Sequence, residues 1–279
     1  MTVTLLGPTE IRTLAARLDV TPTKKLGQNF VVDANTVRKI VHAARVTAAD
    51  RVVEVGPGLG SLTLAILETG ATVTAVEIDH RLAAELPATA RAHGVPEGAL
   101  TVVDADALRV TELPGDPRVL VANLPYNVSV PVLLHFLETF EAIERGVVMV
   151  QAEVGERLAA APGSKVYGAP SAKAAWYGPW RLTGTVSRQV FWPVPNVDSV
   201  LVAFRRDPEP RGSDQERDAT FRIVDAAFQQ RRKMLRQALA TELGGSAAAS
   251  AVLERAGVDP TARGEALTID DFHRIALAR

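Results

Sequence analysis

A glycine-rich segment is the first feature of this 279-residue chain whose residue types could do chemistry. In Glu54-Val-Gly-Pro-Gly-Leu-Gly60 the glycines alternate, after an apolar run and before a helical pattern that begins near Ser61. Glycine lets a backbone approach a ligand closely and adopts the positive φ values of a sharp turn. Gly56 and Gly58 are therefore candidates to contact a nucleotide-like ligand, with a tight structural turn as the plain alternative.

Acidic side chains stand where a parallel sheet would bring them to this loop. Glu77 ends the next apolar run, where a carboxylate can accept the ribose hydroxyls of a nucleoside, and Asp106 follows the third run, where it could accept from an adenine amine. Ser61 replaces the third glycine of the dinucleotide pattern. Glu54 adds another acid beside the loop. Such an acidic cleft suits the positively charged sulfonium of S-adenosylmethionine better than the negatively charged pyrophosphate of a dinucleotide. A nicotinamide or flavin enzyme is the alternative on these residues.

A second segment, Asn123-Leu-Pro-Tyr126, follows the fourth apolar run. The exocyclic amine of adenine is a poor nucleophile, because its lone pair is delocalised into the ring. Acceptors at both amine hydrogens, from the Asn123 side chain and the Leu124 carbonyl, would favour a pyramidal nitrogen aimed at a methyl donor. Pro125 would stiffen the loop, and Tyr126 would stack on the base. Alone these residues also fit a simple turn; beside a glycine loop they favour an S-adenosylmethionine-dependent methyltransferase that acts on a base amine.

The two loops must be positioned by the elements around them, which the sequence shows as short apolar runs alternating with helix-length segments. We expect an α/β fold with a parallel, Rossmann-like sheet of the class I methyltransferase type, because such strands need right-handed helical crossovers. The expected strands are Val52–Val55, Thr72–Glu77, Leu100–Val103, Val119–Ala122, Gly146–Gln151, Trp180–Val186 and Ser199–Phe204. Helices are expected over residues 9–18 and from Asp33 onward.

The domain organisation follows from where the pattern changes. Residues 1–205 are expected to form the methyltransferase domain, with residues 1–50 as an N-terminal helical extension. The polar, Pro- and Gly-rich stretch 206–214 is expected to be a linker. Residues 215–279 are expected to form a small helical domain, whose first helix spans 219–232 and continues through Leu243.

Composition narrows the class of protein. Apolar residues make up 47% of the chain, cysteine is absent and the net charge is -1, so disulfides and thiolate metal sites are excluded and no basic excess points to nucleic acid. The five histidines are scattered without ligand spacing, and no metal site is expected. Lacking a signal-like N-terminus or a run of ~20 apolar residues, the chain is expected to be cytoplasmic.

Taken in order, the motifs resemble those of the ribosomal small-subunit (16S rRNA) adenine N6,N6-dimethyltransferases, the kasugamycin-sensitivity enzymes, over essentially the whole chain. The matching segments are Lys25–Phe30, Glu54–Gly60, Glu77–Asp79, Asp106–Leu108, Asn123–Tyr126, Gln151–Val154, Gly163–Gly168, Phe191–Ser199, Phe228–Lys233 and Gly257–Pro260. The resemblance implies S-adenosylmethionine-dependent dimethylation of two adjacent adenines near the 3′ end of 16S rRNA, in a late 30S or pre-30S particle. We expect the enzyme to be a monomer.

The resemblance also implies which residues hold the cofactor. Asn29 and Val31 would contact it from the N-terminal segment. Gly56 would meet its amino-acid portion, Glu77 its ribose and Asp106 its adenine.

On the RNA side, the resemblance places Asn123 between cofactor and target, and Phe191 on the target base opposite Tyr126. The basic run Arg231-Arg-Lys233 with Arg236 would contact rRNA phosphates. A solvated helix end, where cations are favoured by the helix dipole, is the plain interpretation of that run.

Two further hypotheses stay open. The related macrolide-resistance enzymes methylate adenine in 23S rRNA, and the segments Phe191–Ser199 and Gly257–Pro260 favour the small-subunit enzyme over them. The other hypothesis is a non-catalytic RNA-binding assembly or transcription factor on the same fold. Intact Glu77, Asp106 and Asn123–Tyr126 argue against it.

Overall fold

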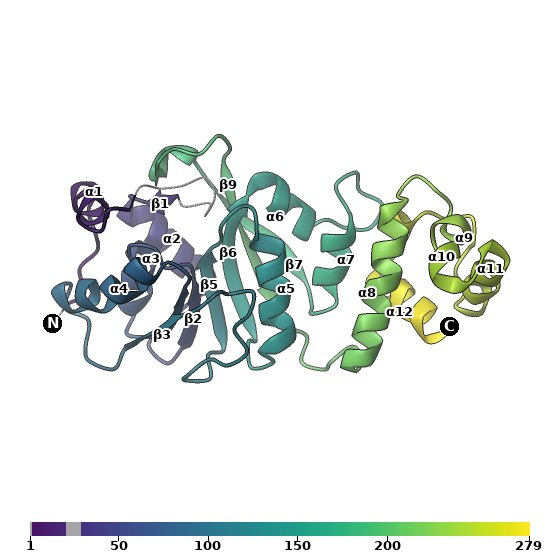
Figure 1. Cartoon of the computed structure of the whole chain (residues 1–279), viewed down its shortest axis with the longest axis horizontal. Helices are drawn as coiled ribbons and strands as arrows, with labels where there is room; N and C mark the ends of the chain where they lie inside the picture. The colour runs from purple at the N-terminus through teal and green to yellow at the C-terminus, as the bar shows by residue number, and fades with distance from the viewer. Residues whose placement is uncertain (1, 21–28) are drawn as a thin grey trace. The chain divides into compact units, whose positions relative to one another are not determined.

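The computed structural model describes residues 2–20 and 29–279 of the chain (Figure 1). By their internal contacts these residues divide into two compact units. Unit 1 comprises Met1–Gly155 with Arg181–Arg206, and unit 2 comprises Glu156–Trp180 with Asp207–Arg279. The part of the Lys25–Phe30 motif before Asn29 lies outside the described residues.

Unit 1 is built on a sheet whose strands, in its described part, run in the order β4-β3-β2-β5-β6-β9-β7. The strands are β2 (Arg51–Val55), β3 (Thr72–Glu77), β4 (Leu100–Asp104), β5 (Val119–Asn123), β6 (Arg145–Gln151), β7 (Trp180–Val186) and β9 (Ser199–Arg205). Neighbours among the first five in this order are parallel, and β9 is antiparallel to β6. The expected Rossmann-like α/β architecture is therefore confirmed.

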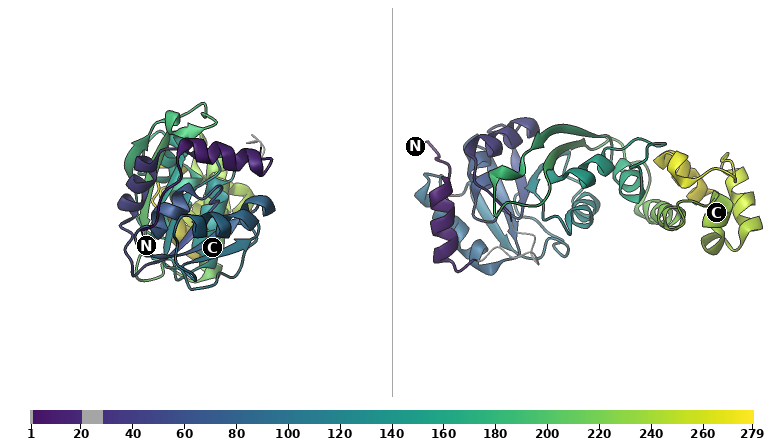
Figure 2. Two further views of the ribbon diagram at one scale, coloured as in Figure 1. Left: turned by 90° about the vertical axis from the view of Figure 1, so that its left-hand side faces the viewer. Right: turned by 90° about the horizontal axis from the view of Figure 1, so that it is seen from above.

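Helices flank the sheet of unit 1 (Figures 1 and 2). They are α1 (Pro8–Arg17), α2 (Ala34–Ala44), α3 (Ser61–Leu67), α4 (His80–Ala92) and α5 (Ser129–Thr139). Helix α1 lies at the edge of the sheet near α4. The strand order turns back between β2 and β5, so right-handed crossovers place α3 and α4 on one face and α5 on the other. The carboxyl ends of β2, β3 and β5 thus meet at the switch point of the sheet, where α/β folds bind ligands.

The helix α2 illustrates how local sequence sets these elements. Asp33 precedes the helix, and its carboxylate accepts a hydrogen bond from the Thr36 amide at 2.7 Å. This cap satisfies an amide that has no partner within the helix. The buried side chains Val37, Ile40 and Val41 lie at helical spacing and pack into the core of unit 1.

A two-stranded sheet joins segments far apart in the sequence. Strand β1 (Phe30–Val31) pairs antiparallel with β8 (Phe191–Trp192), which follows a short 3-10 helix at Arg188–Val190. Phe30 lies opposite Trp192 and Val31 opposite Phe191. Two-residue strands carry no measurable alternation, so the sequence pattern could not predict this pairing.

Gly146 in β6 is packed too tightly for a side chain. An added Cβ would lie 2.3 Å from the Leu120 carbonyl oxygen and 2.5 Å from Cε1 of Phe204. We expect Gly146→Ala to lower the free energy of unfolding by about 1–3 kcal/mol, as overpacked cores do, measured by denaturant unfolding. Gly184→Ala in strand β7 is the matched control, since its Cβ would meet atoms no closer than 3.4 Å. Equal stability of the two variants would contradict the prediction.

Unit 2 is helical. Its helices are α7 (Ala169–Ala175), α8 (Asp214–Gln229), α9 (Leu235–Ala238), α10 (Ala240–Leu243), α11 (Ser246–Arg255) and α12 (Ile269–Leu277), with a 3-10 turn at Gly264–Ala266, while α6 (Ala152–Leu158) spans the boundary between units. Helix α8 packs against α7 and α12. The structure differs here from the expected helix over 219–232. Ser213 and Glu216 form a capping box that starts α8 earlier, and the helix ends at Gln229.

Residues 156–180 were expected in the first domain but belong to unit 2. The reason is their aromatic packing. The Tyr167 hydroxyl donates to the Leu267 carbonyl at 2.9 Å, and the Tyr167 ring packs against Phe228. Trp176 is 6% exposed and lies edge-on to Phe221 of α8. The domain boundary is thus set by buried aromatic area and not by chain order.

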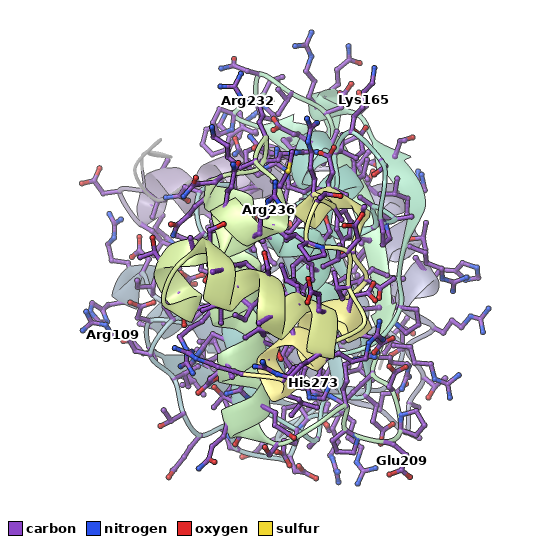
Figure 3. All side chains as sticks on the ribbon, turned by 90° about the vertical axis from the view of Figure 1, so that its right-hand side faces the viewer. Arg109, Lys165, Glu209, Arg232, Arg236 and His273 are labelled. Atoms are coloured by element: carbon purple, nitrogen blue, oxygen red, sulfur yellow. The ribbon has the colours of Figure 1, made fainter. Side chains whose placement is uncertain are left out.

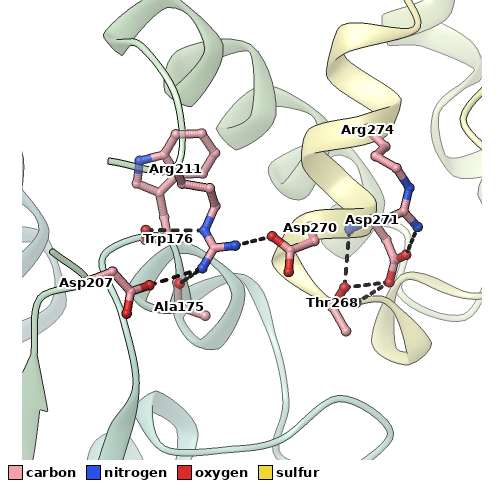
Figure 4. A network of polar contacts seen from close by, with 8 residues as sticks. All are labelled: Ala175, Trp176, Asp207, Arg211, Thr268, Asp270, Asp271 and Arg274. Atoms are coloured by element: carbon pink, nitrogen blue, oxygen red, sulfur yellow. Dashed lines mark hydrogen bonds and ion pairs between the residues drawn. The ribbon is translucent and has the colours of Figure 1, made fainter. Parts of the chain in front are cut away.

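Arg211 fixes the segment that leads into α8. Its guanidinium pairs with Asp207 and with Asp270 of α12, and lies 3.5 Å from the carbonyl oxygens of Ala175 and Trp176 (Figure 4). Residues 207–214 of the expected linker 206–214 therefore belong to unit 2, where the polar contacts of Arg211 hold them.

Candidate active site

A cavity of about 300 Å³ lies at the switch point of the unit 1 sheet. Among its lining residues are all predicted site residues except Phe191, namely Asn29, Val31, Gly56, Gly58, Glu77, Asp106, Asn123, Leu124, Pro125 and Tyr126. The fold thus places residues from segments almost 100 positions apart in the sequence around the same cavity. Volumes of this order suit a nucleoside-sized ligand.

The glycine loop approaches its neighbours as closely as backbone can. Gly56 and Gly58 have φ values of +69° and +59°. A Cβ at Gly58 would lie 2.9 Å from the Phe30 ring, so both its conformation and its surroundings require glycine. At Gly56 an added Cβ would be 3.9 Å from the Asn123 carbonyl oxygen, which places the two predicted loops side by side.

Glu77 holds the glycine loop in place. It is 5% exposed, and its two carboxylate oxygens accept from the Gly58 amide at 3.0 Å and from the Asp79 amide at 2.9 Å. Burial raises the pKa of Glu77, while hydrogen bonds from the amides of Asp79, Gly58 and Ile78 oppose that shift. The Glu77 carboxylate therefore fixes the glycine loop by hydrogen bonds, and it also lines the cavity.

Glu54 is the most buried acid of the cavity, 1% exposed. Burial raises its pKa to about 8, and the charge of Glu77 acts in the same direction. Its Oε2 has no hydrogen-bond partner among the described residues, and neither has the buried Oγ of Ser61, another lining residue. Glu54 was expected beside the glycine loop, but not as a ligand of the cofactor.

The Asn123 side chain is oriented by the N-terminal segment. Its Nδ2 donates to the Asn29 carbonyl at 3.2 Å, which leaves Oδ1 as an acceptor. The following amide, of Leu124, donates to the Met149 carbonyl at 3.1 Å and so fixes the start of the loop to β6. The Asn123 amide is therefore oriented by a contact with the N-terminal segment.

Tyr126 is held at the cavity by one hydroxyl contact. Its hydroxyl lies 3.0 Å from Oγ of Ser199, at the start of β9. Burial raises the pKa of Tyr126, the Ser199 contact lowers it, and the charge of Asp198 raises it. The ring is half-buried and lines the cavity, so a face remains for stacking on a planar ligand.

Apolar side chains accompany Asp106 on the cavity wall. The Asp106 carboxylate accepts from the Leu108 amide at 2.9 Å, which shapes the turn after β4. Ile78 and Leu108 line the cavity and are 50% and 38% exposed, unusually open for large apolar residues. Ile78 was not among the expected site residues, and its position directly after Glu77 is the sequence signal that could have indicated it.

The prediction that Phe191 offers a stacking surface does not fit this structure. Phe191 is 2% exposed and packs in the core of unit 1, and it is absent from the cavity lining. Its backbone pairs with Val31, and strand alternation turns Trp192 the other way. Trp192 is half-buried and stacks on Phe30, with ring centroids 6.3 Å apart.

The histidines stand apart from one another and from the cavity. His80 pairs with Asp104, His93 contacts Thr4 and Glu10, and His135 bonds to a backbone carbonyl. Within residues 2–20 and 29–279, no group of three or more metal-ligating side chains occurs. Over the same ranges, none of the helices has the length and apolar character needed to cross a membrane.

The basic residues near the end of α8 form a separate feature in unit 2 (Figure 3). Arg231 pairs with Glu265 and donates to the Lys165 carbonyl at 2.7 Å. Arg232 and Lys233 are exposed to solvent. Arg231 thus has a structural role, while the next two cations are open to an external partner.

The sheet and its cavity define a class of protein. A parallel sheet that gathers a glycine loop, two strand-end acids and an Asn-Leu-Pro-Tyr loop around one cavity is the arrangement of a class I methyltransferase. The chain is similar to the crystal structure of 23S rRNA methyltransferase ErmE, with a TM-score of 0.66 and 25% identity over 90% of this chain and 99% of that one. It shares its fold with a dimethyladenosine transferase from Plasmodium falciparum, with a TM-score of 0.74 and 24% identity over 87% and 94%.

Sequence comparison gives the family. The profile described as ribosomal RNA adenine dimethylase matches residues 21–278. The chain is 67% identical over 274 residues to Ribosomal RNA small subunit methyltransferase A of Leifsonia xyli subsp. xyli, covering 98% of both, and 61% identical over 275 residues to that of Streptomyces coelicolor, covering 98% of this chain and 96% of the relative. The chain belongs to the ribosomal RNA adenine dimethylase family. The expected family and enzyme class, an rRNA adenine dimethyltransferase, are confirmed.

Proposed function

We propose that this enzyme uses S-adenosylmethionine to dimethylate the N6 amines of two adjacent adenines near the 3′ end of 16S rRNA, in a late 30S or pre-30S particle. The observation that carries the proposal is the contact between the two loops. A Cβ built on Gly56 would lie 3.9 Å from the Asn123 carbonyl oxygen, and both residues line the same cavity, so a methyl donor and an adenine amine bound at them would be neighbours. Relatives up to 67% identical are named for the small ribosomal subunit.

The hydrogen-bonding groups of the cavity fit this cofactor. Glu77 offers a buried carboxylate for ribose hydroxyls, and Asp106 an acceptor for the adenine amine. Ile78 and Leu108 supply exposed apolar surface for the flat adenine ring. Glu54 and Ser61, which line the same cavity, are polar residues that remain for the amino-acid portion. Asn29 and Val31 close the same cavity from the N-terminal side.

The chain's own residues then prepare the amine. When bound, the cofactor supplies an electrophilic methyl group on a sulfonium. Asn123 Oδ1 and the Leu124 carbonyl accept the two amine hydrogens and turn the nitrogen lone pair toward that methyl. Pro125 limits the motion of the loop, and Tyr126 stacks on the base. Orientation and proximity supply most of the acceleration, without a strong base.

The substrate and setting follow from this assignment. An adenine held in rRNA secondary structure must leave its stack to enter the cavity. The exposed Arg232 and Lys233, with Arg236, are proposed to contact rRNA phosphates. We propose that the enzyme acts as a monomer without a metal ion, in the cytoplasm where the small subunit is assembled.

The test is a methylation assay with labelled S-adenosylmethionine on 30S particles that lack this modification, with 50S subunits in parallel. We expect label in 16S rRNA only, mapped to N6 of two adjacent adenines near its 3′ end. Label confined to 23S rRNA would replace the substrate with that of the ErmE-type enzymes, to which the fold is similar. Particle binding without any label would indicate a non-catalytic assembly factor.

A further inference from the structure

The loop of residues 193–198, which joins β8 to β9 within unit 1, carries apolar side chains that the mechanism above does not use. Val194 is 59% exposed and Val197 is 42% exposed. Single exposed apolar residues are ordinary on a protein surface, so such a pair gains meaning only from its place in the fold. Here that place is beside the cavity.

Both ends of the loop are attached to residues that line the cavity. At its start, Trp192 pairs with Phe30 and stacks on the Phe30 ring, which belongs to the N-terminal wall. At its end, Oγ of Ser199 lies 3.0 Å from the hydroxyl of Tyr126, the residue proposed to stack on the target base. The loop therefore runs between two walls of the cavity, on the side where the base is proposed to enter.

Hydrogen bonds and prolines restrict the shape of the loop. The Arg188 amide donates to the Asp198 carboxylate at 2.9 Å, and the Arg188 guanidinium donates to the Asn196 carbonyl at 3.1 Å. Pro193 and Pro195 fix their own φ angles and so reduce the number of conformations that the loop can adopt. Little conformational entropy is then lost when a partner packs against it.

RNA is the partner that this loop suits. The family acts on adenine in rRNA, and an adenine must leave its stack to reach an enclosed site. Its departure leaves a gap between the neighbouring bases, whose faces are apolar, and proteins insert apolar side chains between bases that have been unstacked. Asp198 is the only charged residue of the loop, so the loop offers no cation to an RNA phosphate. Its exposed valines instead match the faces of bases.

We propose that Val194 and Val197 form a wedge that inserts into the RNA stack beside the target adenine and takes the space which that base leaves. The inference rests on the proposed function, because the position of Tyr126 is what marks where the base enters. The two valines are positioning residues. They contact the neighbouring bases and favour the unstacked adenine, and they do not touch the reacting atoms.

The test compares the unaltered full chain with the double variant Val194→Ser/Val197→Ser in single-turnover methylation of 30S particles that lack the modification. We expect the rate to fall roughly 10- to 100-fold, since burial of one valine corresponds to roughly a tenfold change. Both side chains lie outside the cavity lining formed by the described residues, so the Kd for S-adenosylhomocysteine and the unfolding temperature should stay unchanged. An unchanged methylation rate would overturn the inference. If the unaltered enzyme also leaves 16S rRNA unlabelled, the proposed function itself fails.

A signal for base unstacking separates a wedge from any other contact. Particles that carry 2-aminopurine in place of one target adenine report unstacking by a rise in fluorescence, measured with saturating enzyme and S-adenosylhomocysteine. We expect the double variant to give at most roughly a third of the rise that the unaltered enzyme gives. An equal rise, together with slower methylation or weaker particle binding, would show a contact with another surface of the particle and would overturn the inference.

Two further variants test whether apolar contact is what matters. Leu182→Ser removes an exposed apolar side chain from β7 of the same unit, and it should leave the rate and the fluorescence rise unchanged. Val194→Ile/Val197→Ile keeps two branched apolar side chains and should retain at least half of both signals. Failure of the isoleucine variant to retain either signal would show that the loop does not act through apolar contact, and would overturn the inference.

Discussion

Replacing Asn123 with alanine should lower kcat for adenine methylation by roughly 100- to 1,000-fold, the loss found when one oriented polar group that stabilises a transition state is removed. The physical reason is geometric. Nδ2 of Asn123 is committed to the Asn29 carbonyl at 3.2 Å, so Oδ1 is presented as an acceptor without further reorganisation. Alanine removes that acceptor, and the amine lone pair stays delocalised in the ring.

The measurement is single-turnover methylation of 30S particles, with cofactor Kd determined separately. Because one hydrogen bond contributes about 0.5–1.5 kcal/mol, we expect the cofactor Kd to rise by no more than roughly tenfold. Asn35→Ala, at an exposed position of α2 away from the cavity, is the matched control and should keep full activity. A large rise in Kd with unchanged single-turnover rate would instead make Asn123 a cofactor residue only.

Replacing Glu77 with glutamine should weaken cofactor binding by roughly 10- to 100-fold, since hydrogen bonds to a charged group contribute about 1.5–3 kcal/mol. The amide keeps one acceptor oxygen, whereas the carboxylate uses two, toward the amides of Gly58 and Asp79. One of these amides loses its partner, and the glycine loop loses its fixed position. Both effects act on the cavity before any ligand arrives.

Calorimetric titration with S-adenosylhomocysteine, together with thermal unfolding of the free protein, separates the two effects. We expect a lower unfolding temperature without ligand and a smaller ligand-induced increase. Glu97→Gln, an exposed acid, should change neither quantity. Should Glu77→Gln lower the unfolding temperature yet bind with unaltered Kd, the carboxylate would be a support of the loop and not a ribose ligand.

Much of the active site was predictable from local sequence, because chemistry and chain direction constrain it. Alternating apolar runs and helix-length gaps require parallel strands, and parallel strands bring their carboxyl ends to one edge. Glu77, Asp106 and the Asn123 loop each follow such a strand, so the sequence alone places them at one cavity. Their residue types then select an amine methyltransferase over a dehydrogenase.

The contacts between distant segments were not predictable from pattern. The hydrogen bond from Asn123 to Asn29 joins residues 94 positions apart, and the pairing of β1 with β8 involves strands too short to show a period. Phe191 was expected at the base, yet the register of that pairing turns its ring into the core. Register is a property of two strands together, and neither strand carries it alone.

The sequence by itself determined the sheet, the glycine loop, the strand-end acids and the Asn-Leu-Pro-Tyr loop, because each depends on periodicity or backbone conformation within a few residues. Only the tertiary structure decided that residues 156–180 join the helical unit, since that depends on which aromatic rings find a common core. The tertiary structure alone also shows that Glu54 is buried and that its Oε2 has no hydrogen-bond partner within residues 2–20 and 29–279. Burial is set by everything that surrounds a side chain, and burial is what raises the pKa of this acid.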